Sequence, residues 1–121
     1  MNKPLAVIVE DDIEIKTIFE LALQTEFEIA AFQEGSAALN HLQHLSPALV
    51  ILDLNMPDMS GVDVLKAIKN DERLKSIPVI LATADAALAA TLENAADLVL
   101  IKPISPVQLR SLARRIGLLN S

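Results

Sequence analysis

The stretch Leu49-Val50-Ile51-Leu52-Asp53, which continues as Leu54-Asn55-Met56-Pro57-Asp58-Met59-Ser60-Gly61, decides the fold of this chain. Four consecutive apolar residues predict a strand that is buried on both faces, and an acidic residue ends it. Three further apolar runs also stop at polar residues: residues 5–9 at Glu10-Asp11-Asp12, residues 79–82 at Thr83, and residues 98–101 at Lys102-Pro103. Because the carboxyl ends of parallel strands meet at one edge of a sheet, we expect these polar residues to lie together.

Helical periodicity separates the apolar runs, so strands and helices alternate along the chain. We expect helices over residues 12–25, 36–45, 60–70 and 85–94, and a last helix with N-cap Ser105, first residue Pro106 and a stop at Gly117. The more mixed segment 27–32 predicts an edge strand. The pattern predicts an α/β fold: one domain over residues 1–121 with a doubly wound, open parallel sheet of five strand–helix units.

Composition excludes several classes of function. The 121 residues include no Cys, which rules out disulfides and thiolate metal sites and is consistent with a reducing compartment. No apolar run approaches the roughly 20 residues of a membrane helix, so we expect a cytoplasmic protein without a membrane partner. A net charge of −6 and an aromatic content of 2% argue against nucleic acid as a direct partner.

The acidic residues at the strand ends predict a metal site. Glu10, Asp11 and Asp53 would bring up to three negative charges together, and two unit charges about 4 Å apart repel by about 4 kcal/mol at an effective dielectric near 20. Mg²⁺ prefers oxygen ligands and retains several waters. We therefore expect the carboxylates of Asp11 and Asp53, a backbone carbonyl two residues later, and water to hold Mg²⁺, with Lys102 adding positive charge to the pocket.

Each of these residues alone has a simpler interpretation. An Asp after a strand is usually a turn former or helix cap, and Asp12 fits an N-cap best. A Thr after a strand usually satisfies local backbone groups, and a single Lys is usually a solvated charge. The agreement of four separate strand ends is what favours a functional site.

The combined motifs resemble the receiver domains of two-component response regulators, of the chemotaxis-regulator kind, over essentially the whole chain. The matching motifs are Asp53-x-Asn55-x-Pro57-x-x-x-Gly61, Glu10-Asp11, Thr83-Ala84 and Lys102-Pro103. The resemblance implies a flavodoxin-like sheet with strand order 2-1-3-4-5. It also implies that Pro103 follows a cis peptide bond, which would aim Lys102 inward.

The resemblance implies a role for each acidic residue. Asp53 would be the nucleophile that accepts a phosphoryl group from a phosphohistidine on a sensor histidine kinase or phosphotransfer protein. Glu10 and Asp11 would hold Mg²⁺, Glu10 through water, together with Asp53 and the carbonyl of Asn55. The acyl phosphate so formed is hydrolysable, and the phosphorylated state would therefore be transient.

The resemblance also implies roles for the other strand ends. Lys102 would pair with the phosphoryl oxygens, and Thr83 would bond them in the active state with help from the Ala84 backbone N–H. Asn55 and Asp85, each two residues after a site residue, would tune hydrolysis. We hypothesise that Asp85 helps to orient the attacking water.

One departure from the family pattern concerns switching. Family members often carry an aromatic residue three positions before the Lys, where this chain has Val99, and another after the Lys-Pro pair, where it has Ile104. Coupling of Thr83 to an aromatic ring swing is therefore not expected. We predict an aliphatic output face that contains Val99, Ile104, Leu88 and Leu92.

Three functions compete at this point. The first is a phosphorylation-controlled switch that catalyses only its own phosphorylation and dephosphorylation, exists as a monomer or weak phosphorylation-dependent dimer, and binds an unknown output protein. The second is a receiver-like interaction module that works without phosphorylation. The third, a haloacid-dehalogenase phosphatase, needs a second Asp where this chain has Asn55, and a cap for which the chain is too short. The sequence leaves open the cognate kinase and whether the domain stands alone or belongs to a larger protein.

Overall fold

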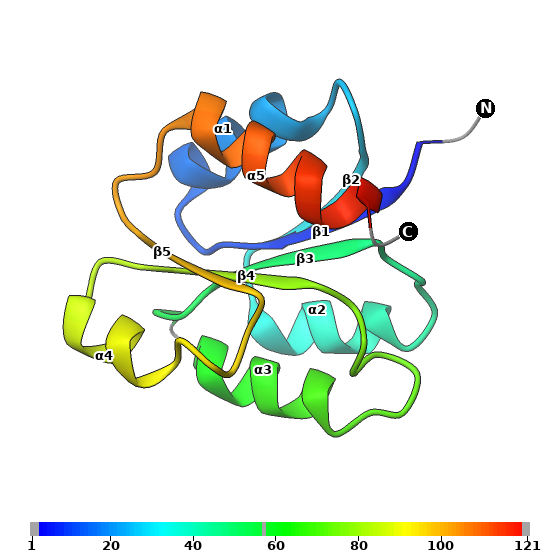
Figure 1. Cartoon of the computed structure of the whole chain (residues 1–121). Coiled ribbons are helices and arrows are strands. Elements are labelled where there is room, and N and C mark those ends of the chain that lie inside the picture. The colour runs from blue at the N-terminus through cyan, green and yellow to red at the C-terminus, as the bar shows by residue number, and fades with distance from the viewer. Residues whose placement is uncertain (1–2, 57, 120–121) are drawn as a thin grey trace.

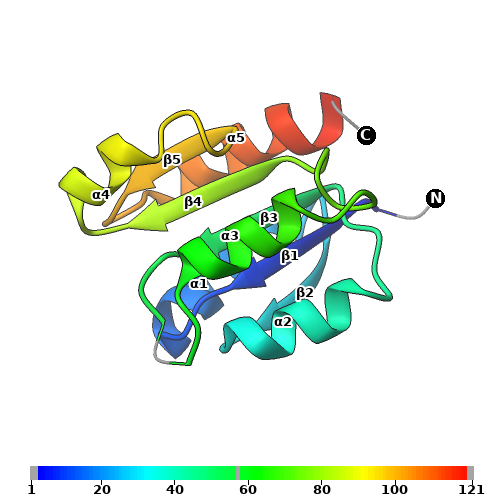
Figure 2. The same cartoon turned by 90° about the horizontal axis from the view of Figure 1, so that it is seen from below.

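A computed structural model of the chain describes residues 3–56 and 58–119. Pro57 of the motif and both ends of the predicted domain lie outside the described residues. Five parallel strands form one sheet in the order β2-β1-β3-β4-β5, as the resemblance implied (Figures 1 and 2). The strands are β1 (Leu5–Val9), β2 (Glu28–Phe32), β3 (Leu49–Asp53), β4 (Val79–Thr83) and β5 (Leu98–Ile101). The segment predicted as an edge strand is β2, at one edge of the sheet.

Helices cover both faces of the sheet. The helices are α1 (Ile13–Leu23), α2 (Gly35–Leu42), α3 (Gly61–Lys69), α4 (Ala86–Thr91) and α5 (Pro106–Leu119). Figure 1 shows α1 and α5 on one face and α2, α3 and α4 on the other. Two apolar clusters fill the two layers, and the central strands β1, β3 and β4 contribute alternate residues to each. This arrangement explains why those strands are apolar at every position except the last residues of β3 and β4, Asp53 and Thr83.

Local side-chain caps begin several helices. The Asp12 carboxylate accepts hydrogen bonds from the backbone N–H groups of Glu14 and Ile15, so Asp12 is the N-cap of α1, as predicted. The hydroxyl of Ser105 accepts one from Gln108 N at 3.3 Å at the predicted start of α5. The starts of these helices are therefore encoded within a few residues.

The predicted end of the last helix is wrong. Helix α5 continues through Gly117 to Leu119. Gly117 is buried, and a Cβ atom there would lie 2.9 Å from the ring of Phe27. The glycine allows the helix to approach Phe27 closely, and it does not terminate the helix.

Helices α2 and α4 each end three residues before the position that the periodicity predicts. Helix α2 ends at Leu42 and α4 at Thr91, where tighter turns replace the helical hydrogen bonds: Leu92 N donates to Ala89 O at 3.1 Å, and Ala95 N donates to Leu92 O at 2.9 Å. Across the described ranges, no helix combines the length and the apolar character that a membrane crossing requires.

Candidate functional site

Three buried polar residues mark the carboxyl edge of the sheet. Within the described part of the chain, Glu10, Asp53 and Thr83 are the buried residues with polar or charged side chains, at 0–1% exposure. Asp53 and Thr83 end β3 and β4, and Glu10 directly follows β1. The strands are in register here, with Asp53 opposite Ala82. Parallel pairing therefore brings the strand ends together, as the apolar runs predicted.

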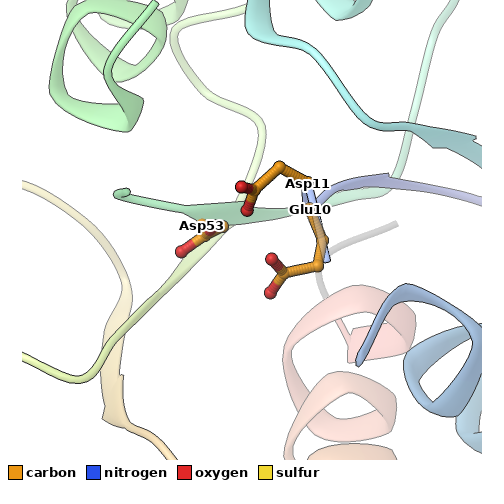
Figure 3. A group of neighbouring side chains, drawn as sticks. All are labelled: Glu10, Asp11 and Asp53. Atoms are coloured by element: carbon orange, nitrogen blue, oxygen red, sulfur yellow. The ribbon is translucent and has the colours of Figure 1, made fainter. Parts of the chain in front are cut away.

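Asp11 completes an acidic cluster with two of these residues. Figure 3 shows the side chains of Glu10, Asp11 and Asp53 converging on one space from the ends of β1 and β3. One carboxylate oxygen from each lies within 4.8 Å of the others. Such a set of oxygen atoms suits a hard divalent cation.

Lys102 supplies a positive charge to the same pocket. Its Nζ lies 2.9 Å from Glu10 Oε1 and 3.1 Å from Asp53 Oδ1. Its backbone N–H donates to Thr83 O at 2.8 Å, which ties the segment after β5 to the end of β4. The Lys102–Pro103 peptide bond is cis, as the resemblance implied. The ammonium group neutralises part of the acidic charge.

Burial raises the affinity of the pocket for protons. Burial, reinforced by the neighbouring Asp53, raises the pKa of Glu10 to about 7 even though Lys102 opposes the shift. Burial likewise raises the pKa of Asp53. Burial alone would lower the pKa of Lys102, but its ion pairs with both carboxylates outweigh this and raise it. A cation that enters the pocket would displace these protons and offset the same negative charge.

The two carboxylate oxygens of Asp53 have different surroundings. Oδ1 accepts hydrogen bonds from Lys102 Nζ and, at 3.2 Å, from Asn55 N. Oδ2 is buried and has no hydrogen-bond partner among the residues that the structure describes. A buried carboxylate oxygen without a partner is costly, so a ligand that contacts it would stabilise the pocket.

The acidic cluster fits a divalent metal ion. The donors are Asp11, Asp53 and Glu10, and the backbone bends at Leu54 immediately beyond β3, next to Asn55. All of them are oxygen donors, which Mg²⁺ and similar cations prefer to the nitrogen and sulfur ligands of zinc sites. The unsatisfied Asp53 Oδ2 gives such an ion a physical reason to bind.

The residues at the end of β4 and directly after it form local hydrogen bonds. Thr83 Oγ1 accepts from Asp85 N at 3.0 Å, and the Asp85 carboxylate accepts from Leu88 N at 3.0 Å as the N-cap of α4. Ala84 between them is exposed. The structure thus links Thr83 to the start of α4, while the predicted roles of Thr83, Ala84 and Asp85 in phosphoryl binding and hydrolysis stay predictions.

The residues predicted as an output face do not form one group. Leu88, Leu92 and Val99 are half-buried against the core cluster between the sheet and helices α2, α3 and α4. Ile104 packs against the cluster on the opposite face of the sheet. Among large apolar side chains in this region, Ile101 and Val107 are more exposed, at 46% and 68%. An output role for the four predicted residues stays a prediction.

Asp58 has structural links that the sequence did not reveal. Its carboxylate accepts three hydrogen bonds from Gly35 and Ser36 at the start of α2. These residues are more than 20 positions away in the sequence, so no local sequence pattern predicts the contact. Asp58 joins the loop after β3 to the neighbouring helix.

Comparisons with known proteins agree with this geometry. The family model for the response regulator receiver domain matches residues 6–114. The DNA-binding response regulator MtrA of Mycolicibacterium smegmatis (strain ATCC 700084 / mc(2)155) is 34% identical over 109 residues, covering 85% of this chain and 46% of MtrA. The chain spans about half the length of the curated response regulators that it matches.

Solved structures show the same fold. The chemotaxis response regulator CheY4 of Vibrio cholerae superposes with a TM-score of 0.87 at 25% identity, covering 95% of this chain and 99% of that chain. The Mn²⁺-bound form of response regulator Rcp1 superposes with a TM-score of 0.77 at 25% identity, covering 93% and 92%. The match of the family model, the relatives and the strand order lead to one conclusion: this chain belongs to the receiver domains of two-component response regulators.

Proposed function

We propose that the domain accepts a phosphoryl group on Asp53 in a Mg²⁺-dependent reaction and thereby changes its affinity for an output partner. The observation that carries this proposal is the asymmetry of Asp53. Lys102 and the Asn55 N–H orient Oδ1, while Oδ2 lies buried beside two further carboxylates and has no partner among the described residues. One oxygen is thus held and the other is free to react. Receiver domains take phosphoryl groups from histidine kinases, so a phosphohistidine is the expected donor.

The side chains of the pocket have complementary tasks in this reaction. A carboxylate oxygen of Asp53 attacks phosphorus, a P–O bond forms, and the P–N bond of the donor phosphohistidine breaks. The Lys102 ammonium, held by Glu10 and Asp53, offsets negative charge on the phosphoryl oxygens. Thr83, at the end of the neighbouring strand, bonds those oxygens with the Ala84 N–H once the group is attached.

Glu10, Asp11, Asp53 and the Asn55 carbonyl hold the divalent cation in this proposal. Bound there, Mg²⁺ neutralises charge that develops on the transferred group. The Mn²⁺-bound form of Rcp1 supports a divalent site in a domain of this fold. DNA binding, which the name of MtrA states, concerns a longer protein of which the match covers 46%, and it is no part of the proposal.

In this proposal the domain catalyses only the attachment of a phosphoryl group to Asp53 and the hydrolysis of that group. It accelerates the attachment and hydrolysis of that group, and Asp85 positions the water for hydrolysis. The mechanism needs only the pocket at the carboxyl edge of the sheet. The output is therefore a binding event and not a released product.

Phosphorylation is tested by incubation with acetyl phosphate and Mg²⁺, followed by intact-mass measurement. We expect a mass increase of one phosphoryl group, its absence in EDTA, and its absence in Asp53→Asn. A well-folded wild-type protein that gains no mass from acetyl phosphate or from a histidine kinase would contradict the proposal and favour a phosphorylation-independent interaction module.

A further inference from the structure

The loop between β3 and α3 is closed tightly at its base. Gly61 N donates to Leu54 O at 3.1 Å, and a Cβ atom on Gly61 would lie 2.3 Å from Asp53 O. The chain therefore leaves the sheet after Asp53 and returns to almost the same place. This closure fixes the two ends of the loop and leaves its middle to be held by another contact.

Asp58 provides that second contact. Its Oδ1 accepts from Gly35 N at 3.2 Å, and its Oδ2 accepts from Ser36 N at 3.2 Å and Ser36 Oγ at 2.7 Å. The N-cap residue of α2, Glu34, makes no side-chain capping bond. Asp58 thus supplies from the loop the cap that α2 lacks in its own sequence. The Ser36 hydroxyl lowers the pKa of Asp58, so the cap is charged at neutral pH.

Packing beside the cap is close. A Cβ atom on Gly35 would lie 2.8 Å from Val64 Cγ2 and 3.3 Å from both Met56 Cε and Met59 Cβ. Both methionines are half-buried against the core cluster. The loop therefore cannot move away from α2 without breaking the Asp58 hydrogen bonds and opening this apolar contact.

We propose that Asp58 is a positioning residue for the divalent-cation site: by capping α2 it holds the loop that carries the Asn55 carbonyl at the carboxyl edge of the sheet. The inference rests on the proposed function, which assigns the cation to this edge. Asp58 itself does not contact the ion. Its role is to restrict the loop to the observed conformation, in which Asn55 N donates to Asp53 Oδ1 at 3.2 Å.

The test compares Mg²⁺ affinity by calorimetric titration in the wild type, Asp58→Ala and Asp58→Asn, well below their melting temperatures. We expect Asp58→Ala to weaken binding about tenfold, the lower end for groups that orient metal ligands. Asp58→Asn should weaken it clearly less than Asp58→Ala, because an amide oxygen still accepts a backbone hydrogen bond. Both variants lose the same charge, so their difference isolates the hydrogen bonds.

The loop between α3 and β4 lies at the opposite edge of the sheet (Figure 1), and its residue Asp71 offers a matched control. Its Oδ1 accepts from Arg73 N at 2.8 Å and from Leu74 N at 3.3 Å in the loop between α3 and β4. Like Asp58, it fixes a loop through backbone N–H groups. We expect Asp71→Ala to lower the melting temperature and leave Mg²⁺ affinity unchanged.

Two outcomes would overturn the inference and spare the proposed function. In one, Asp58→Ala lowers the melting temperature and binds Mg²⁺ as tightly as the wild type, so Asp58 only stabilises the fold. In the other, Asp58→Asn and Asp58→Ala weaken binding equally, so only charge matters. A wild-type protein that does not bind Mg²⁺ would instead refute the cation site and the inference with it.

Discussion

Leu52 and Asp53 are neighbours in β3 and are almost equally buried, at 0% and 1% exposure. Leu52 belongs to the strand interior, where each side chain contributes to an apolar cluster on one face of the sheet. Asp53 belongs to the carboxyl edge, where burial raises its pKa and Lys102 pairs with its carboxylate. Burial of apolar side chains stabilises a fold whatever the charge around them, whereas burial of carboxylates costs free energy unless they are paired.

The largest effect is expected in the strand interior. Leu81 is fully buried in β4, so Leu81→Ala should lower the free energy of unfolding by about 3 kcal/mol through lost burial and a cavity. Urea denaturation with and without Mg²⁺ should give the same loss. A loss that Mg²⁺ largely repairs would show that the interior and the edge are not independent.

The next effect concerns the charge balance at the edge. Lys102→Met would leave Glu10 and Asp53 facing each other without a counter-charge, which should cost about 2 kcal/mol in EDTA, less than a fully buried pair because protonation relieves part of the strain. Mg²⁺ should recover much of the loss in urea denaturation. As a control, Lys16→Met breaks the Lys16–Glu20 pair on α1 and should cost at most about 0.5 kcal/mol, independent of Mg²⁺.

A smaller effect with the opposite sign is expected for Asp53→Asn. Removal of one buried charge should raise the free energy of unfolding in EDTA, because burial raises the pKa of Asp53 and so destabilises its ionised form. The same variant should lose the stabilisation that Mg²⁺ gives the wild type, which differential scanning calorimetry measures. An unchanged or lower melting temperature in EDTA would contradict the picture of crowded charge.

The pH dependence of stability in EDTA should be gradual. Folding raises the pKa of Glu10 from 4.5 to about 7, so the folded state holds the proton more tightly. This contribution to stability is fully present below pH 4.5 and is lost as the pH rises through about 7. Relative to Glu10→Gln, the wild type should therefore lose stability over this window in thermal melts. A wild type that gains stability relative to the variant as the pH rises would reverse the predicted sign.

Much of the site could be predicted because its geometry follows from strand order along the chain. Apolar runs predicted the strands. Parallel strands bring Glu10, Asp53, Thr83 and Lys102, which lie at or directly after the strand ends, to one edge of the sheet. The cap at Asp12 was equally readable, because it needs only the next three residues. These features depend on local periodicity and on the polarity of the sheet.

Tertiary packing decided the features that local patterns cannot encode. Gly117 lies inside α5 because the ring of Phe27 needs the space of its missing side chain. Asp58 caps a helix that begins 23 residues earlier in the chain. The pKa of Glu10 depends on how deeply the folded sheet buries it beside Asp53. The sequence by itself determined the order of elements and the chemistry at the strand ends, whereas contacts between distant segments decided how tightly each group is held and charged, because burial and long-range hydrogen bonds exist only once the layers have packed.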